Sequence, residues 1–493
     1  MGFTHTALLR RLMPLLVVGL AAWTYLTYGF SGEISRDDAF YAHCGQRVAD
    51  GYAPYERVFD VTGPLASMIP AVGVKAARYA GVPDHHGIQA QFVILSILTV
   101  LSVYLLGLEV TGSAIAGGLA AVTFVGFEEF LENASAASPK IAMTLLMTLA
   151  LLCVLRRRWA LAGALIAAAA LTWQAMVLVG IAAVAATAGE ARGQRARATL
   201  ALVAGGLAVV AAIAAWFAAH GALTELWDSA VVSLFYLASR ASDLPVGWYF
   251  WRVLRLSYRG YPHNFMAACL GSVGLIAAFV EARRQAGRSL GALLGSRWSS
   301  ILVSFVLLLG FSVLDFQGAP DAYTLLPPVS LGLGYLLWRA MSAMTGPEAL
   351  IRPGQQVVAA ALVALALLGP TIVHVKFNPG EGLERQKQIA GEIVARLDGG
   401  TLQCINAPAV LYLGEVRNAT RHVIVSPPLL DFIDEHETGG VGGWLRDIED
   451  SNVELIVNHT RPVRTHMPEL EQWVQDNYRL WRTYEDWSVY ERP

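Results

Sequence analysis

Uncharged apolar runs, separated by short charged segments, recur over the first 375 positions of the chain. A helix that spans a bilayer needs about 20 apolar residues. The pattern predicts spans at residues 12–30, 88–108, 113–127, 141–155, 198–219, 264–280, 298–314, 322–338 and 353–373, with two more inside 159–189. Several runs are short and must include flanking polar residues. The pattern therefore predicts a polytopic α-helical membrane protein with about eleven transmembrane helices.

Arginines between the runs indicate which ends face the cytoplasm, because positive residues in short loops remain on that side of a membrane. Clusters at 156–158 and 192–197 flank the run at 159–189, so both ends of this run should be inside. The run is therefore predicted to cross twice, with a tight turn near residues 172–174. Clusters at Arg10/Arg11, 283–297 and 339–352 fit the same side.

Two segments of the N-terminal region are open to more than one interpretation. The first run could be a secretory signal, but no small-residue cleavage site follows it, which favours an uncleaved anchor with a cytoplasmic N-terminus. Segment 64–81 carries Lys75 and Arg78 among apolar residues and is expected to lie flat in the outer interface. The loops at 31–87, 128–140, 220–263 and 315–321 are then outside, together with everything after about residue 376.

From Lys376 the composition becomes that of a soluble domain. Helices are predicted at 382–400 and 468–478, strands at 401–406, 421–425 and 453–459, and a closing hairpin at 479–493. Alternating strands and helices predict a small α/β domain at 376–493, after a transmembrane domain at 1–375. It has no phosphate-binding glycine loop or nucleophile elbow, so a scaffold or lid is favoured over a second catalytic centre.

Composition excludes several classes of function. Hydrophobic residues make up 55% of the chain and charged residues 15%, and the net charge of −2 leaves no concentrated basic face for nucleic acid. Four cysteines form neither a disulfide framework nor a CxxC metal site, although a single bridge between Cys44 and Cys404 stays conceivable.

The segment 35–65 carries the candidate chemistry, because it places Asp37 and Asp38 directly after the first apolar run. Paired carboxylates can act as a general base and its partner, and two close carboxylates raise the pKa of one of them. The alternative is that both acids only cap the helix that follows, where Asp is favoured.

The chain resembles the membrane-embedded glycosyltransferases that use polyprenyl-phosphate sugars. This broad group has the GT-C fold and includes glycosyltransferase family 39, with the protein O-mannosyltransferases, and the lipid A aminoarabinose transferases. The residues that carry the resemblance are Asp37-Asp38, Tyr41, Ala42, Gly51, Pro54-Tyr55, Asp60 and Gly63-Pro64, and later Tyr323, Pro327 and Pro328. The resemblance extends to a second acidic outer loop, the hairpin near 159–189 and the closing α/β domain.

The resemblance implies catalysis by Asp37, with Asp38 orienting it or the acceptor, and binding of donor or acceptor by Tyr41, Tyr55, Asp60 and Tyr323. Two positions depart from the pattern. Many members have Lys before the Gly-Pro, where this chain has Thr62, and a basic residue or His beside the later Tyr, where it has Asp321 and Ala322. Both departures remove cations expected near the donor phosphate.

Other outer loops supply further candidates. Glu128, Glu129 and Glu132 end a span, where Glu129 could assist the acceptor or join Asp37 at a divalent metal ion, or the three could simply be solvated. Candidate contacts to the leaving phosphate are Lys140, Arg252, Arg255, Arg259 and His263, with several aromatic residues among them. Interfacial anchoring would produce the same aromatic and arginine composition.

These observations predict an integral membrane glycosyltransferase. It would transfer one sugar, with inversion, from a polyprenyl-phosphate donor to a glycolipid, polysaccharide or protein on the outer face of the cytoplasmic membrane. A flippase or transporter is an alternative, but its charged residues should lie at mid-membrane. A noncatalytic relative that binds the carrier is another, suggested by Thr62 and Asp321.

Overall fold

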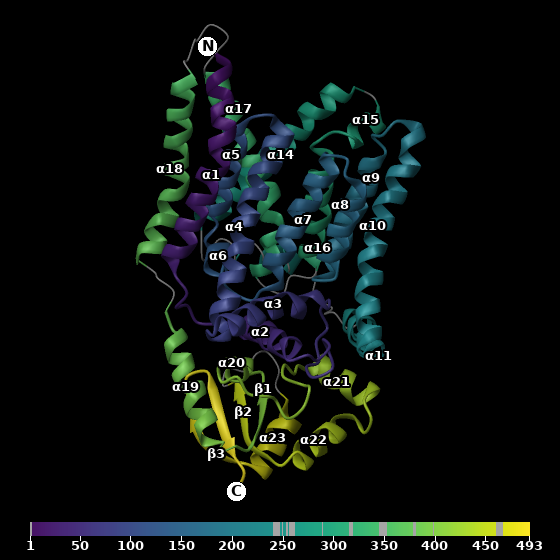
Figure 1. Ribbon diagram of the computed structural model, residues 1–493, viewed down its shortest axis with the longest axis vertical. Helices are drawn as coiled ribbons and strands as arrows, with labels where there is room; N and C mark the ends of the chain where they lie inside the picture. Colours follow the sequence, from purple (N-terminus) through teal and green to yellow (C-terminus); the bar gives the residue numbers. More distant parts are fainter. Residues whose placement is uncertain are drawn as a thin grey trace.

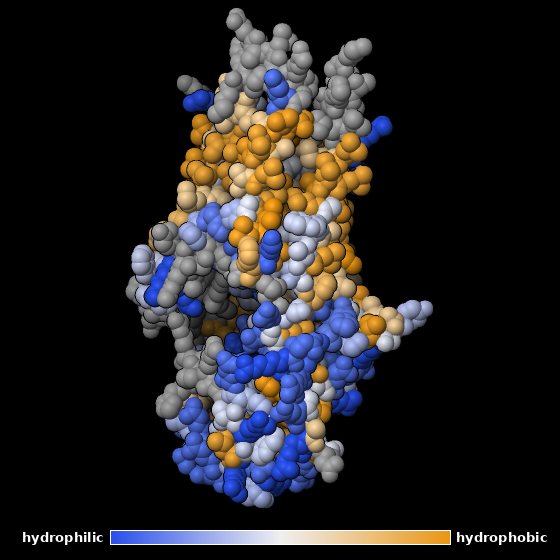
Figure 2. Space-filling view, turned by 90° about the vertical axis from the view of Figure 1, so that its left-hand side faces the viewer, coloured by the Kyte–Doolittle hydropathy of each residue, from blue (hydrophilic) through white to orange (hydrophobic). Residues whose placement is uncertain are grey.

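The computed structural model is an elongated helical bundle that carries a small α/β layer at one end (Figure 1). It describes residues 2–239, 247–248, 250–252, 255, 262–287, 289–314, 319–344, 353–377, 381–397, 399–459 and 467–493. On the face shown in Figure 2, apolar side chains cover much of the helical bundle, whereas hydrophilic side chains cover most of the end that carries the α/β layer. This division is that of a membrane body with a polar head.

Each predicted span coincides with a helix of the bundle within the described residues. These helices are α1 (Gly2–Tyr28), α4 (Asp84–Thr111), α5 (Ala114–Val125), α7 (Pro139–Leu155), α8 (Trp159–Ala170), α9 (Val177–Thr187), α10 (Arg192–Ala219), α14 (Pro262–Ala286), α16 (Ser299–Leu314), α17 (Leu326–Met344) and α18 (Pro353–Phe377). By length and composition, α4, α10, α14 and residues Val357–Phe377 of α18 are each sufficient to cross a membrane. The polytopic helical class is therefore confirmed.

Short helical segments connect or cover the bundle. They are α2 (Arg36–Ala49), α3 (Leu65–Ala80), α6 (Glu128–Glu132), the 3-10 turns η1 (Gln174–Met176) and η3 (Ala319–Leu325), α11 (Leu223–Trp227), the π-helical η2 (Asp228–Val232), α12 (Ser233–Ser239) and α15 (Leu290–Leu294). Helices α2 and α3 lie across the end of the bundle, between it and the α/β layer (Figure 1). The prediction that 64–81 lies flat rather than spanning fits this position.

The hairpin predicted inside 159–189 is present, since α8 ends at Ala170 and α9 begins at Val177 after the turn η1. The predicted clusters of arginine also gather at one end of the bundle. At that end Arg156 pairs with Glu109 at 3.1 Å, Arg297 donates to the Glu109 carbonyl at 2.6 Å, and Arg10 donates to the Gly112 carbonyl at 2.9 Å. The α/β layer lies at the other end (Figure 1).

Glycines permit close packing of two helix pairs. A Cβ added at Gly332 of α17 would collide with the carbonyl of Gly271 in α14, and one at Gly163 of α8 would collide with the backbone of Leu202 in α10. Small residues let helix backbones approach in a lipid environment, where water does not drive association. These contacts hold α14 against α17 and α8 against α10.

The C-terminal layer is a four-stranded sheet flanked by helices. Its elements are α19 (Leu383–Arg396), β1 (Thr401–Ile405), α20 (Pro408–Leu413), α21 (Pro427–His436), α22 (Gly440–Asp450), β2 (Val453–His459), α23 (Pro468–Asn477), β3 (Arg479–Thr483) and β4 (Trp487–Glu491). The strand order is β1-β2-β4-β3, with β1 parallel to β2 and the other pairs antiparallel. The predicted helices, two of the predicted strands and the closing hairpin are confirmed.

The strand predicted at 421–425 is wrong. This segment runs beside the end of β1, but its backbone bonds to scattered partners, both side chains and single backbone amides, instead of forming a strand ladder. Asn406 accepts from the Val425 amide and donates to the Val425 carbonyl, both at 2.9 Å, and Gln403 donates to the His422 carbonyl at 3.1 Å. Its apolar residues, such as Val423, are buried, which explains the strand-like pattern.

Candidate active site

A cavity of about 450 Å³ lies between one end of the helical bundle and the C-terminal layer. We call it the acid cavity. Its polar lining is Ser35, Asp37, Asp38, Tyr41, Asp60, Thr62, Asn133, Ser138, Lys140, Asp321 and Ser426. Ile424, Ser426 and Leu429 come from the C-terminal layer, which therefore covers one side of the cavity. Three predicted candidates that are far apart in sequence, Asp37, Asp60 and Lys140, meet here.

The first turn of α2 places the two aspartates differently. Ser35 caps α2, accepting from the Asp38 amide at 3.2 Å, while its hydroxyl donates to the Asp38 carboxylate at 2.6 Å. The Asp38 side chain is buried, and this burial raises its pKa to about 6, with nearby Asp37 adding a smaller contribution. The Asp37 side chain is 66% exposed, and its carboxylate contacts Arg36 at 3.0 Å. Both aspartates line the cavity, but Asp38 is buried and takes part in capping, whereas Asp37 stays exposed.

Lys140 provides a cation in the lining of the same cavity as Asp37 and Asp38. It lies in the first turn of α7, its ammonium pairs with Asp321 at 2.5 Å, and it lies over the ring of Trp173. Lys140 and Asp321 are both nearly buried, and burying a charge is favourable only when it is paired. Asp321, which stands where a basic residue or His was expected, therefore holds Lys140 in place.

The loop after α2 is shaped by its own hydrogen bonds. The Asp60 carboxylate accepts from the Thr62 amide at 3.0 Å and from the Thr62 hydroxyl at 2.6 Å, and burial raises the Asp60 pKa to about 6. The Tyr55 hydroxyl donates to the Thr62 carbonyl at 2.7 Å. Tyr55 has a left-handed φ of 72° and does not line the acid cavity, whereas Tyr41 does.

The Gly-Pro pair of the predicted motif packs this loop against the hairpin turn. A Cβ at Gly63 would collide with the backbone of Leu171, whose carbonyl accepts from the Leu65 amide at 3.0 Å. Gln174 also donates to the Val61 carbonyl at 3.1 Å. Two features that were predicted separately, the motif and the hairpin, thus form one structure beside the cavity.

The second acidic segment lies next to the cavity without lining it. Glu128 contacts His263 at 3.1 Å, Glu132 contacts His374 at 3.0 Å, and the Glu129 carbonyl accepts from the Tyr323 hydroxyl at 2.8 Å. Burial, followed by the charge of Glu132, raises the Glu129 pKa to about 7. Tyr323 is fully buried, so it fixes α6 rather than reaching the cavity.

The predicted arginines of the 220–263 loop are not part of the described cavity. Arg255 is exposed, and Arg252 lies over the Trp248 ring at 5.4 Å. Arg259 lies outside the described residues. All four cysteines, including Cys44 and Cys404, are free thiols.

The described part of the chain does not assemble a metal site from Asp37 and Glu129. No group of three or more His, Cys, Asp or Glu side chains is close enough there to hold a metal ion. Divalent cations such as Ca²⁺ and Mg²⁺ prefer oxygen-rich sites, and Asp37 contacts Arg36 instead. We therefore derive no step through a metal.

An apolar groove of about 580 Å³ runs along α8, α9 and α10 and reaches Leu171 and Gln174 at its outer end. Except for Gln174, its lining is made of Gly, Ala, Leu, Ile and Val side chains. Trp173, which lines the acid cavity, lies between Leu171 and Gln174, so the groove ends beside that cavity. The groove could not be predicted from the sequence, because an apolar run has the same composition whether it faces lipid or a cleft.

Comparisons with solved structures find the same fold at low sequence identity. ArnT from Cupriavidus metallidurans, solved with undecaprenyl phosphate bound, is 14% identical over 97% of both chains, with a TM-score of 0.65. The oligosaccharyltransferase AglB from Archaeoglobus fulgidus is 13% identical over 91% of this chain and 70% of its own, with a TM-score of 0.55. The mycobacterial arabinofuranosyltransferase AftD is 15% identical over 98% of this chain and 41% of its own, with a TM-score of 0.51.

No protein-family model and no curated protein sequence matches this chain. The structural likeness shows the fold, which is the GT-C fold expected from the resemblance in sequence. The expected combination of a helical membrane body with a small α/β domain is confirmed with it.

Proposed function

We propose that this protein is an integral membrane glycosyltransferase. It transfers one sugar, with inversion, from a polyprenyl-phosphate donor to a hydroxyl of a glycolipid, cell-envelope polysaccharide or protein. The observation that carries this proposal is the acid cavity, where Asp37, Asp38 and Lys140 line one space beside the end of an apolar groove. The neighbours ArnT and AglB were solved with polyprenyl phosphates, which supports the same class of donor here.

The acid cavity supplies the two groups that a single displacement requires. The acceptor oxygen attacks the anomeric carbon, the bond from that carbon to the phosphate oxygen breaks, and the acceptor proton passes to Asp37. The released phosphate gains negative charge, which the ammonium of Lys140 offsets in a partly dry site. One displacement inverts the anomeric carbon.

Lys140 also supplies a cation that the residues Thr62 and Asp321 do not provide at their positions. The cation missing before Gly63 is replaced by one from α7, and Asp321 is the residue that holds it. Asp321 would release the ammonium toward a phosphate, which is a stronger partner because it carries more charge. The departures are therefore compatible with donor binding.

The apolar groove suits the isoprenoid chain of such a donor. Its outer end lies next to Trp173 in the acid cavity, so a chain in the groove would bring its phosphate close to Lys140. The chain would enter the groove from lipid rather than from water, so van der Waals packing against these side chains would hold it there. The C-terminal layer would act as a lid, since Ile424 and Leu429 close the opposite side.

We place the acid cavity on the outer face of the cytoplasmic membrane. The arginine clusters lie at the opposite end of the bundle, around Glu109 and Gly112, and positive residues in short loops favour the cytoplasm. The orientation is tested with the variant Tyr79→Cys in intact cells, because the side chain at this position is 97% exposed. Labelling by a membrane-impermeant maleimide is expected.

The enzyme assay uses purified full-length protein in detergent and a panel of polyprenyl-phosphate sugars with candidate acceptors. Released polyprenyl phosphate is measured for wild type, Asp37→Asn and the control Asp476→Asn, an exposed aspartate on α23. We expect release by the wild type and the control, and its loss in Asp37→Asn with an unchanged elution volume.

Other outcomes would contradict the proposal. Full release by Asp37→Asn would remove Asp37 from the chemistry. Movement of the lipid-linked sugar across vesicles without release would identify a flippase. Binding of the carrier with neither activity would identify a noncatalytic relative.

A further inference from the structure

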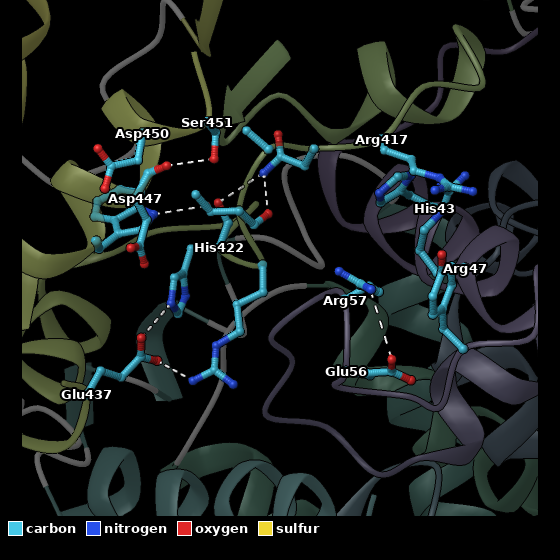
Figure 3. Close-up of a pocket in the computed structure, with 16 residues that line it drawn as sticks. His43, Arg47, Glu56, Arg57, Arg417, His422, Glu437, Asp447, Asp450 and Ser451 are labelled. Carbon is cyan, nitrogen blue, oxygen red and sulfur yellow. Dashed lines mark hydrogen bonds and ion pairs between the residues drawn. The ribbon is translucent and has the colours of Figure 1, made fainter. Parts of the chain in front are cut away.

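A second polar cavity, of about 540 Å³, lies between the loop after α2 and the C-terminal layer. We call it the outer cavity (Figure 3). Its lining comes from both bodies: His43, Arg47, Tyr52, Glu56 and Arg57 on one side, and residues 417–422, Glu437, Trp444, Asp447, Asp450 and Ser451 on the other. None of these residues lines the acid cavity, and none was a candidate in the sequence.

A thin wall separates the two cavities. Phe59 lines the acid cavity, and its amide donates to the Arg421 carbonyl at 2.8 Å. The Phe59 ring contacts the ring of His422, with centroids 5.4 Å apart, and Arg421 and His422 both line the outer cavity. A ligand group in the outer cavity is therefore held one wall away from Asp37.

One side of the outer cavity is strongly cationic. The guanidinium groups of Arg57 and Arg417 lie 4.9 Å and 5.7 Å from the centre of the Tyr52 ring. Arg47 comes close enough to Arg417 that, after burial, this like charge is a further cause lowering the Arg47 pKa. Arg47 pairs with Asp50 at 3.3 Å, whereas Arg57 reaches Glu56 only at 3.9 Å, so these two carboxylates offset part of the positive charge of the three arginines.

Three residues that line this cavity carry a buried polar atom without a hydrogen-bond partner in the described part of the chain. Arg47 is 7% exposed, His43 1% and His422 2%, yet Arg47 Nε, His43 Nδ1 and His422 Nδ1 have no hydrogen-bond partner among the described residues. A buried unpaired donor costs about 1–3 kcal/mol. Burial, then the charge of Arg47, lowers the His43 pKa to about 3, so the arginines carry the positive charge.

The other side of the cavity carries hydrogen-bond acceptors and an aromatic ring. Asp447, Asp450 and Ser451 lie together at the end of α22, across the cavity from Arg47 and Arg417 (Figure 3). Trp444 lies in the same helix. Carboxylates accept hydrogen bonds from sugar hydroxyls, and aromatic faces cover the apolar face of a sugar ring.

We propose that the outer cavity binds an acidic saccharide, a sugar ring that carries a phosphate or carboxylate group. The anion is held by Arg47, Arg57 and Arg417, and the ring hydroxyls by Asp447 and Asp450. Arginine suits this task because its planar fork binds such anions through two parallel hydrogen bonds. That the saccharide belongs to the acceptor rests on the proposed glycosyltransferase function, whereas the binding site stands without it.

The test measures binding of glucose 1-phosphate to the purified full chain by isothermal titration calorimetry, with glucose and inorganic phosphate as separate arms. We expect glucose 1-phosphate to bind more tightly than phosphate, and glucose not to bind. The exposed Arg417→Gln and Arg57→Gln variants should each weaken binding by roughly 10- to 100-fold. The control is Arg385→Gln, an exposed arginine of α19 that pairs with Glu485 outside the cavity.

Equal binding by Arg417→Gln and wild type, or an equal loss in Arg385→Gln, would overturn the site. Phosphate binding as tightly as glucose 1-phosphate would overturn its assignment to a saccharide. Asp37→Asn separates this proposal from the enzyme: it should keep the binding and lose carrier release. Absence of carrier release from the wild type, with binding that still depends on Arg417, would sink the enzymatic proposal and leave the site intact.

Discussion

Replacing Asp38 by Asn should stabilise the protein at high pH and not at low pH. Burial holds the pKa of this carboxyl at about 6, against 3.8 for an ordinary aspartate. The folded protein therefore binds the proton more tightly than the unfolded chain does. Stability is lost as the pH rises from about 4 to about 6, and above that range the loss is complete.

The magnitude follows from the size of the pKa change. Each tenfold change in proton affinity corresponds to about 1.4 kcal/mol, so the ionised Asp38 costs about 3 kcal/mol at pH 8 and under about 1 kcal/mol at pH 4. Asn cannot ionise and keeps an oxygen that accepts from the Ser35 hydroxyl. Asp38→Asn should therefore regain most of that cost at pH 8 and little at pH 4.

The assay follows thermal unfolding in detergent by tryptophan fluorescence at pH 8 and pH 4. The matched control is Asp37→Asn, whose side chain is largely exposed and should change the midpoint little at either pH. Asp38→Asn should also release less carrier, because the ionised group no longer orients the site. A gain of the same size at both pH values, or a lower midpoint at pH 8, would refute the reasoning from burial.

Three further predictions test the wall of the acid cavity and the bundle. Lys140→Gln should lower kcat/KM for carrier release by roughly 10- to 100-fold, because the leaving phosphate loses its cation. The double variant with Asp321→Asn, which also removes the negative charge beside position 140, should be equally inactive; an active double variant would exclude the cation. Tyr323→Phe should lower the free energy of unfolding by about 1–3 kcal/mol, because the Glu129 carbonyl loses its donor; an unchanged unfolding midpoint would contradict this. Gly332→Leu should separate α14 from α17 and yield aggregated protein in size-exclusion chromatography, whereas a monodisperse peak would contradict the packing.

The fold could be predicted because its signals are local. Apolar runs between arginine clusters gave the helices, and two clusters alone required the turn inside 159–189. The strand predicted at 421–425 failed because its backbone bonds to the side chains of Gln403 and Asn406 and to single amides rather than to a neighbouring strand, and no local pattern in the sequence indicates such partners. The segment is rich in apolar residues because it is buried, although it does not form a strand.

The residues of the candidate site also differ in whether a local pattern could predict them. Asp37, Asp38, Tyr41 and Asp60 belong to one continuous segment, so a motif could find them. The pairing of Lys140 with Asp321 joins positions 181 residues apart, and the sequence presented each only as a candidate or a departure. The outer cavity was harder still to predict from the sequence. None of the residues in its two walls belongs to the motif, and only folding brings the two walls together.

The two interpretations of the aspartate pair, helix cap and active site, describe a single arrangement. Ser35 caps α2 and binds Asp38, which fixes that carboxylate inside and commits it to a raised pKa. The next position back along the helix turns toward the cavity, so Asp37 remains exposed and able to accept a proton. The cap therefore does not compete with catalysis: it decides which of two adjacent acids is buried and which meets the acceptor.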